Sequence, residues 1–271
     1  MIGAFLASVD PKNKNQVIGG ISAVLSMFFG LAVWGIYTAT TPVKAGQAVS
    51  SINRIAEMLG GSMPLGLIQV VTFFFFLYGL LTLLHQKAML QREQEAFKMG
   101  LLPTVGEKIV KPEQVQEFKL KMLELENSGY RFQLIGMIKR VCNQYRNEGS
   151  ISDTLEVLNT QTESAREESQ THYGIVEYLS PGVSSLGFLG TVLGISDAIG
   201  KFDQAGTQEG LSLITKSLYV AFDTTFFALL LGIVLSYYYN RVQDDEQRLF
   251  ASMKAYIVDN LVSRIYHGGV K

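Results

Sequence analysis

The sequence contains little cysteine, little charge and no excess of basic residues, and each shortage excludes a class of protein. The single cysteine, Cys142, excludes a framework of intrachain disulfides, and no CxxC pair or Cys/His cluster is present to bind zinc. We interpret Cys142 as a small buried apolar residue. The formal net charge of -1 shows no excess of basic residues that would attract phosphates, so nucleic-acid binding is not expected.

The sequence also lacks the motifs that are typical of enzyme active sites. Its three histidines, His85, His172 and His267, are scattered along the chain, and neither a Ser/His/Asp order nor a phosphate loop with Gly-Lys-Ser/Thr is found. We therefore expect no catalytic residues, no metal site, no cofactor and no enzymatic activity.

Apolar residues are abundant instead. Hydrophobic residues make up 48% of the chain and charged residues 17%, which is too apolar for an ordinary soluble domain. About 20 apolar residues suffice to cross a bilayer, and four segments reach this length: residues 17–40, 58–84, 182–200 and 218–240. The first two contain no charge, the third contains only Asp197 and the fourth only Asp223. The sequence predicts an all-α integral membrane protein with four transmembrane helices.

The segments suggest four parts. Residues 1–86 form an N-terminal tail and two peripheral transmembrane helices, residues 181–240 the third and fourth transmembrane helices, and residues 241–271 a C-terminal helix. In residues 87–180, apolar side chains recur at helical spacing, which predicts a helical domain. Its third helix is expected to start at Ser152 and to extend toward the third span.

The basic residues predict the orientation. Only four of the 23 Lys and Arg residues lie in the two short loops, and these are Lys44, Arg54, Lys201 and Lys216. The others lie in the tails and in the long connection. Because cytoplasmic loops carry an excess of Lys and Arg, both termini and the helical domain are expected in the cytoplasm.

Small and hydroxylated residues form one side of each late span. On the third span they fall within an arc of roughly 140°: Ser184, Gly187, Gly190, Thr191, Gly194 and Asp197. On the fourth they cluster within roughly 120°: Ser217, Ala221, Thr224, Ala228, Gly232 and Ser236, next to Thr225. Close helix packing in lipid is one interpretation. A hydroxyl-lined path for hydrated ions or protons is the other.

The two aspartates differ in position. Asp197 lies near the outer end of its span, which suits an entrance to a path. Asp223 points about 160° away from Thr225, with Lys216 on its own face of the helix. A carboxylate facing lipid costs about 2.5 to 3.5 kcal/mol, so we expect a buried polar contact that involves Asp223 and Lys216. Direct ion coordination by Asp223 is the alternative.

These features resemble a known family. The shared pattern is a proline at the helix start, a glycine ladder with a Gly-Thr pair, and a second helix with two threonines: Pro181, Gly187, Gly190, Thr191 and Gly194, then Ala221, Asp223, Thr224 and Thr225, and finally Tyr239 and Asn240. Over residues 178–265 the chain is similar to the MotA/TolQ/ExbB ion channel family. The order of two spans, a long insert and two further spans resembles the MotA arrangement.

The resemblance implies a homopentamer in a bacterial inner membrane, part of a proton- or sodium-driven rotary motor. Its third and fourth helices would surround a dimeric, single-span partner of the MotB/TolR/ExbD type. The ion pathway would include Thr191, Thr224, Thr225 and Asp197. Helix packing around the partner would involve the small residues Ser184, Gly187, Gly190, Gly194, Ala221, Ala228 and Gly232. The transported ion is H+ or Na+.

A partner is also expected from the residues themselves. An ion-driven device needs a carboxylate that changes charge within the membrane, and none projects from the threonine side of the fourth span. The resemblance implies that an aspartate on the partner's helix supplies it. The alternative function is a structural membrane scaffold that anchors a cytoplasmic partner without conducting ions. A secondary transporter is disfavoured because no inverted repeat is detectable.

Overall fold

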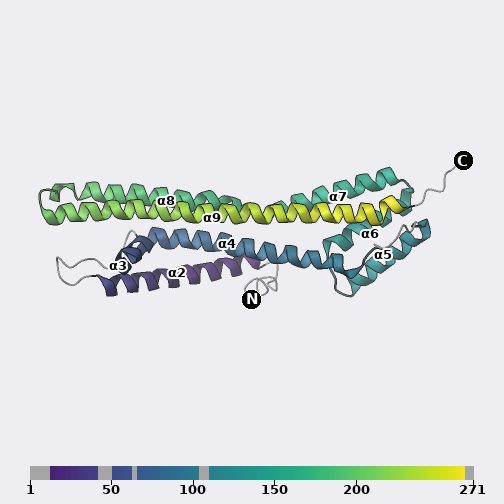
Figure 1. Cartoon of the computed structure of the whole chain (residues 1–271), viewed down its shortest axis with the longest axis horizontal. Coiled ribbons are helices and arrows are strands. Elements are labelled where there is room, and N and C mark those ends of the chain that lie inside the picture. The colour runs from purple at the N-terminus through teal and green to yellow at the C-terminus, as the bar shows by residue number, and fades with distance from the viewer. Residues whose placement is uncertain (1–12, 42–50, 63–65, 104–109, 266–271) are drawn as a thin grey trace. The chain divides into compact units, whose positions relative to one another are not determined.

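A computed structural model of the chain describes residues 13–41, 51–62, 66–103 and 110–265. Within these ranges the backbone is helical and contains no strand (Figure 1). The long helices are α2 (Lys14–Thr40), α4 (Leu67–Gln94), α5 (Pro112–Asn127), α6 (Gln133–Glu148), α7 (Ile151–Thr171), α8 (Gly174–Gly200) and α9 (Gln208–Asn260). Shorter ones are α3 (Ser51–Ala56), η1 (Glu57–Gly61), η2 (Glu95–Met99), η3 (Phe202–Gln204) and η4 (Val262–Arg264).

Four helical stretches in the described residues are long and apolar enough to cross a membrane. They are Lys14–Thr40, Leu67–Met99, Gly174–Gly200 and Gln208–Arg264. Each contains or overlaps one of the four segments expected from the sequence. The prediction of an all-α membrane protein with four transmembrane helices is confirmed.

The contacts between elements divide the chain into two compact units. The membrane unit comprises residues 1–85 and 174–240, and the helical unit comprises residues 86–173 and 241–271. The membrane unit thus joins the first and third predicted parts, and the helical unit joins the second and fourth. Both α4 and α9 contribute residues to both units.

In the membrane unit, α2 packs along α4 (Figure 1). The ring of Phe29 lies 4.4 Å from the ring of Phe73, and Ile18 packs with Leu81. At Gly30 an added Cβ would lie only 2.7 Å from Val70. Small residues on one helix therefore accept large residues of the other, as expected where helices associate in lipid.

The second span begins later than the sequence predicts. We expected it to start at residue 58, but α4 starts at Leu67. Gly60 has a φ of 102°, a conformation that L side chains rarely adopt, and it ends the helical path of η1. Gly61 lies so close to α2 that an added Cβ would be 2.5 Å from the Cβ of Tyr37. The two glycines let the chain turn against α2 before α4 begins.

The helical unit contains the predicted helices after the second span. Ser150 caps α7 by accepting a hydrogen bond from the Asp153 backbone N–H at 3.3 Å. The helix ends at Thr171, and α8 starts at Gly174. The expected extension of α7 into the third span is therefore interrupted by a turn at residues 172–173.

The core of the helical unit combines α5, α6, α7 and the C-terminal part of α9. Its fully buried side chains include Met122, Leu134, Ile138, Leu158, Met253 and Ile257. Of the C-terminal helix predicted at residues 241–271, residues 241–260 are the end of the continuous helix α9, and η4 follows it. Residues 266–271 lie outside the described residues. Cys142 is 1% exposed in this core, and burial raises the pKa of its thiol to about 12.

Candidate functional site

Helices α8 and α9 lie side by side (Figure 1), and the small residues of one pack directly against those of the other. At each of four glycines, an added Cβ would collide with one residue of the other helix. The facing pairs are Gly187 with Ala228, Gly190 with Thr224, Gly194 with Ala221, and Gly232 with Ser184. Residue numbers rise along α8 as they fall along α9, so the two helices are antiparallel and in close backbone contact.

This contact changes the role that the sequence analysis assigned to these residues. We had assigned the seven small residues to packing around a partner. The structure places them between α8 and α9 of the same chain, because a close helix contact needs small residues on both helices. These residues therefore form an intrachain helix contact, and packing around a partner stays a prediction.

Thr191 and Thr225 meet at the edge of the α8–α9 contact. The Thr191 hydroxyl is hydrogen-bonded to the Thr225 hydroxyl. Thr191 also lies 3.1 Å from the carbonyl oxygen of Ala221, and Thr225 donates to the carbonyl oxygen of Gly187 at 2.8 Å. Both threonines are partly exposed. Two hydroxyls from two helices are thus brought together beside the accessible surface of the chain.

Thr224 is separated from this pair. It is 2% exposed, faces Gly190, and donates to the carbonyl oxygen of Ala221 at 2.8 Å. Its hydroxyl lies inside the helix contact, whereas those of Thr191 and Thr225 lie at its edge. Of the three predicted threonines, the structure brings two together where a molecule outside the chain can reach them.

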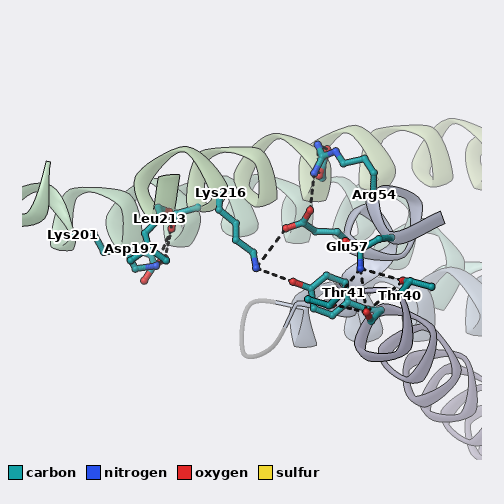
Figure 2. Close-up of polar contacts among 12 residues, drawn as sticks. Thr40, Thr41, Arg54, Glu57, Asp197, Lys201, Leu213 and Lys216 are labelled. Carbon is teal, nitrogen blue, oxygen red and sulfur yellow. Dashed lines mark hydrogen bonds and ion pairs between the residues drawn. The ribbon is translucent and has the colours of Figure 1, made fainter. Parts of the chain in front are cut away.

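Asp197 lies near the C-terminal end of α8 in a compact polar cluster. Its Oδ2 accepts hydrogen bonds from Lys201 Nζ and from Ser217 Oγ, each at 2.5 Å. Figure 2 shows Asp197 next to Lys201, one helical turn later. The carboxylate is therefore paired with an ammonium group of its own chain. The sequence analysis did not name Lys201 as a partner of Asp197.

Asp223 is buried, with 7% of its surface exposed. Its carboxylate forms an ion pair with Arg54 of α3, with Nη2 3.0 Å from Oδ2. The sequence analysis placed Asp223 in a polar contact with Lys216 but missed Arg54. Lys216 instead lies 3.9 Å from Glu57 and donates to the Tyr37 hydroxyl at 2.7 Å (Figure 2). The sequence contained one indication of this partner, because Arg54 is one of few charged residues in a short loop between two spans.

Part of the chain matches a known family. Residues 131–255 match the model of the MotA/TolQ/ExbB proton channel family. No curated protein and no solved structure matches the chain. The match includes the glycine ladder and all three threonines, so the resemblance seen in the sequence is confirmed.

The match of residues 131–255 to a proton channel family, together with four apolar helices, supports a membrane protein with a function in ion transport. This family comprises channels, not enzymes, and its members work with partner proteins in membrane complexes. Large apolar side chains of α8 and α9 remain exposed: Phe188, Val192, Ile199, Phe222, Phe226, Ile233 and Tyr237. In a membrane, such surfaces are available to lipid and to other helices.

Proposed function

We propose that this protein is the ion-conducting ring subunit of a proton- or sodium-driven rotary membrane motor. Five copies surround a dimeric, single-span partner of the MotB/TolR/ExbD type, and ion-motive force is converted into mechanical work. The proposal rests on the family of residues 131–255 and on the four apolar helices. One local observation carries it, which is the meeting of Thr191 and Thr225 at an exposed edge.

The threonine pair supplies neutral oxygens within a membrane-spanning segment. Each hydroxyl has one proton and two lone pairs, and nearby carbonyl oxygens of Gly187 and Ala221 compete for the protons. Lone pairs are then left to accept a hydrogen bond from water or to coordinate a partly dehydrated sodium ion. This edge of the α8–α9 contact is our proposed ion path.

The acid that drives the motor is proposed to come from the partner. The third and fourth spans contain two carboxylates, Asp197 and Asp223. Asp197 is paired with Lys201 near the end of α8, and Asp223 is paired with Arg54. Neither is placed to change charge beside the threonine pair, so the path needs a partner's transmembrane aspartate.

We further propose a bacterial inner membrane as the location, with both termini in the cytoplasm. The distribution of Lys and Arg supports this orientation, because the short loops contain only four of the 23. In this orientation the helical unit lies in the cytoplasm. The pair of Asp197 and Lys201 and the pair of Asp223 and Arg54 then lie near the outer surface of the membrane.

An ion-flux measurement tests the proposal. A tagged chain is purified from its own cells with the proteins that accompany it, and the complex is placed in liposomes. Flux is followed with a pH-sensitive dye under a proton gradient and with a sodium-sensitive dye under a sodium gradient. We expect flux of one of the two ions above that of empty liposomes. The scaffold alternative predicts an assembled complex with neither flux.

A further inference from the structure

An ion pair joins two segments of the membrane unit that are far apart in the sequence. Arg54 Nη2 donates to Asp223 Oδ1 at 3.1 Å and lies 3.0 Å from Oδ2, so one nitrogen contacts both carboxylate oxygens. Only 10% of the Asp223 side chain is exposed, whereas 35% of the Arg54 side chain is exposed. The pair therefore ties the short helix α3 to α9 at a buried carboxylate.

Two further contacts fix the guanidinium of Arg54. Its Cζ lies 4.6 Å from the centre of the Tyr219 ring, which is a cation–π distance. Its Nη1 donates to Glu57 Oε2 at 3.3 Å, and the Glu57 side chain is 12% exposed (Figure 2). Tyr219 lies on α9, one turn before Asp223. The arginine is thus held by an aromatic face and two carboxylates.

The cluster as a whole alternates in charge. Glu57 lies between Arg54 and Lys216, and Lys216 in turn donates to the Tyr37 hydroxyl at the end of α2 (Figure 2). Two carboxylates and two cations leave no net charge. Such a cluster does not concentrate ions, but it makes each buried charge depend on its neighbour.

The position of Asp223 on α9 separates it from the threonine pair. Asp223 and Thr225 are two residues apart, which places their side chains about 160° apart around the helix. Thr225 contacts α8, whereas Asp223 contacts α3. A carboxylate only half a turn from the proposed path is thereby kept on the opposite side of α9.

We propose that Arg54 is a positioning residue of the ion path: it neutralises Asp223, fixes α9 against α3, and keeps this carboxylate from binding the transported ion. This inference rests on the proposed function, because the path is the one defined by Thr191 and Thr225. It predicts how the loss of the two charges affects the complex. They matter only as a pair, so removing both must do less harm than removing either one.

The test uses three variants of the full complex: Arg54→Gln, Asp223→Asn and the double variant Arg54→Gln/Asp223→Asn. The assembled fraction in mild detergent is measured by size exclusion after heating. We expect each single variant to lose most of the assembled complex at a temperature that wild type survives. The double variant is expected to recover at least half of the lost assembled complex.

Asp223→Leu is expected to assemble less well than Asp223→Asn, because leucine cannot accept a hydrogen bond from Arg54. The control is Arg166→Gln, from an exposed ion pair with Glu163, and it should assemble as wild type does.

Flux through the surviving complexes separates positioning from a purely structural role. In Arg54→Gln, Asp223 loses the guanidinium that neutralises it, so protons from the medium are left to balance its charge. We expect the flux of this variant to gain a step in its dependence on external pH. Wild type, in which Asp223 is paired, and the double variant, in which it is replaced, should show no such step, because Glu57 keeps Lys216 as a neighbour in both.

Three outcomes would overturn the inference. A double variant that assembles but does not conduct, while wild type conducts, would make Asp223 a direct ion ligand. If the double variant is as unstable as the single variants, the loss of assembled complex in the single variants is not caused by an unpaired charge. Identical pH profiles for Arg54→Gln and wild type would exclude positioning. If wild type itself conducts no ion, the proposed function fails, and the assembly series still decides whether the charges act as a pair.

Discussion

Thr191, Thr224 and Thr225 are equivalent in the sequence pattern but differ in the structure. The pattern places all three on the small-residue side of a span, and only packing decides which hydroxyl stays accessible. Thr224 is buried against Gly190, whereas the side chains of Thr191 and Thr225 are partly exposed. The sequence could therefore predict the residue types of the path but not the member that packing would bury.

The first prediction concerns the threonine pair. Replacing both Thr191 and Thr225 by valine keeps the shape and removes two hydroxyls. Because a hydrogen bond to a charged group contributes about 1.5 to 3 kcal/mol, we expect ion flux in liposomes to fall at least about tenfold, with the complex still assembled. The matched control is Thr215→Val, since the Thr215 hydroxyl donates to the Leu211 carbonyl oxygen of its own helix. Unchanged flux in the double variant would remove the pair from the path.

The second prediction concerns the helix contact. In Gly190→Ala the added Cβ collides with Thr224, and overpacking of this kind costs about 1 to 3 kcal/mol. We expect the complex to lose its native state at a lower temperature, measured by a thermal aggregation assay in detergent. Gly136→Ala on α6, where an added Cβ meets nothing within 4 Å, serves as the control and should not lower it. Adding Thr224→Gly should restore part of the loss. Equal stability of the two alanine variants would contradict the packing described here.

The third prediction concerns Cys142. Its thiol is 1% exposed and its pKa is raised from 9.0 to about 12 by burial. At pH 8 the thiolate fraction is then about a thousandfold lower than for an unperturbed thiol, and the thiolate is the reactive form. We expect iodoacetamide to label the native protein extremely slowly and the denatured protein readily, as read by mass spectrometry. Comparable rates in the two states would show that this core opens freely.

At the scale of elements, apolar length and periodicity predict most of the helices. The first and third spans end at residues 40 and 200, as in α2 and α8. The second span begins nine residues late because Gly60 and Gly61 turn the chain against α2. Hydropathy could not reveal this, since both glycines and their neighbours are uncharged. The continuous α9 was likewise divided in the prediction, because its polarity changes near residue 240 while its backbone does not.

The contacts between elements were the least predictable feature. Arg54 and Asp223 are separated by 169 positions, and nothing local links them. Burial of Asp223 follows from the cost of a carboxylate in lipid, but its partner depends on how α3 packs against α9 within the membrane unit. The same reasoning applies to Lys216, which shares a helix face with Asp223 and yet contacts Glu57 and Tyr37.

The fourth prediction belongs to the end of α8, where Lys201 pairs with Asp197. In Lys201→Met the carboxylate, 38% exposed in its side chain, loses its ammonium partner. An unpaired negative charge attracts cations by up to about 1 kcal/mol at 4 Å in water. We therefore expect cation flux to rise by up to about fivefold at low ionic strength and to return toward wild type as salt screens the charge. Lys139→Met, from the ion pair with Glu126 in the helical unit, is the control. A rise that is independent of salt would contradict a role of Asp197 at the entrance.

At the scale of the whole molecule, the chain is proposed to be one part of a larger machine. The α8–α9 contact is complete within the chain, whereas the threonine edge and the apolar side chains around it face outward. Both carboxylates of the third and fourth spans are engaged by basic groups of the same chain. An ion-driven motor built on this chain needs copies of itself around a partner that brings an acid.

The composition of the native complex tests this claim most directly. A tagged chain is expressed from its own locus, purified in mild detergent, and weighed intact by native mass spectrometry. We predict five copies of the 30.0 kDa chain together with two copies of a second protein that has one transmembrane span and an aspartate within it. A complex that contains only this chain, or one without such an aspartate, would contradict the account.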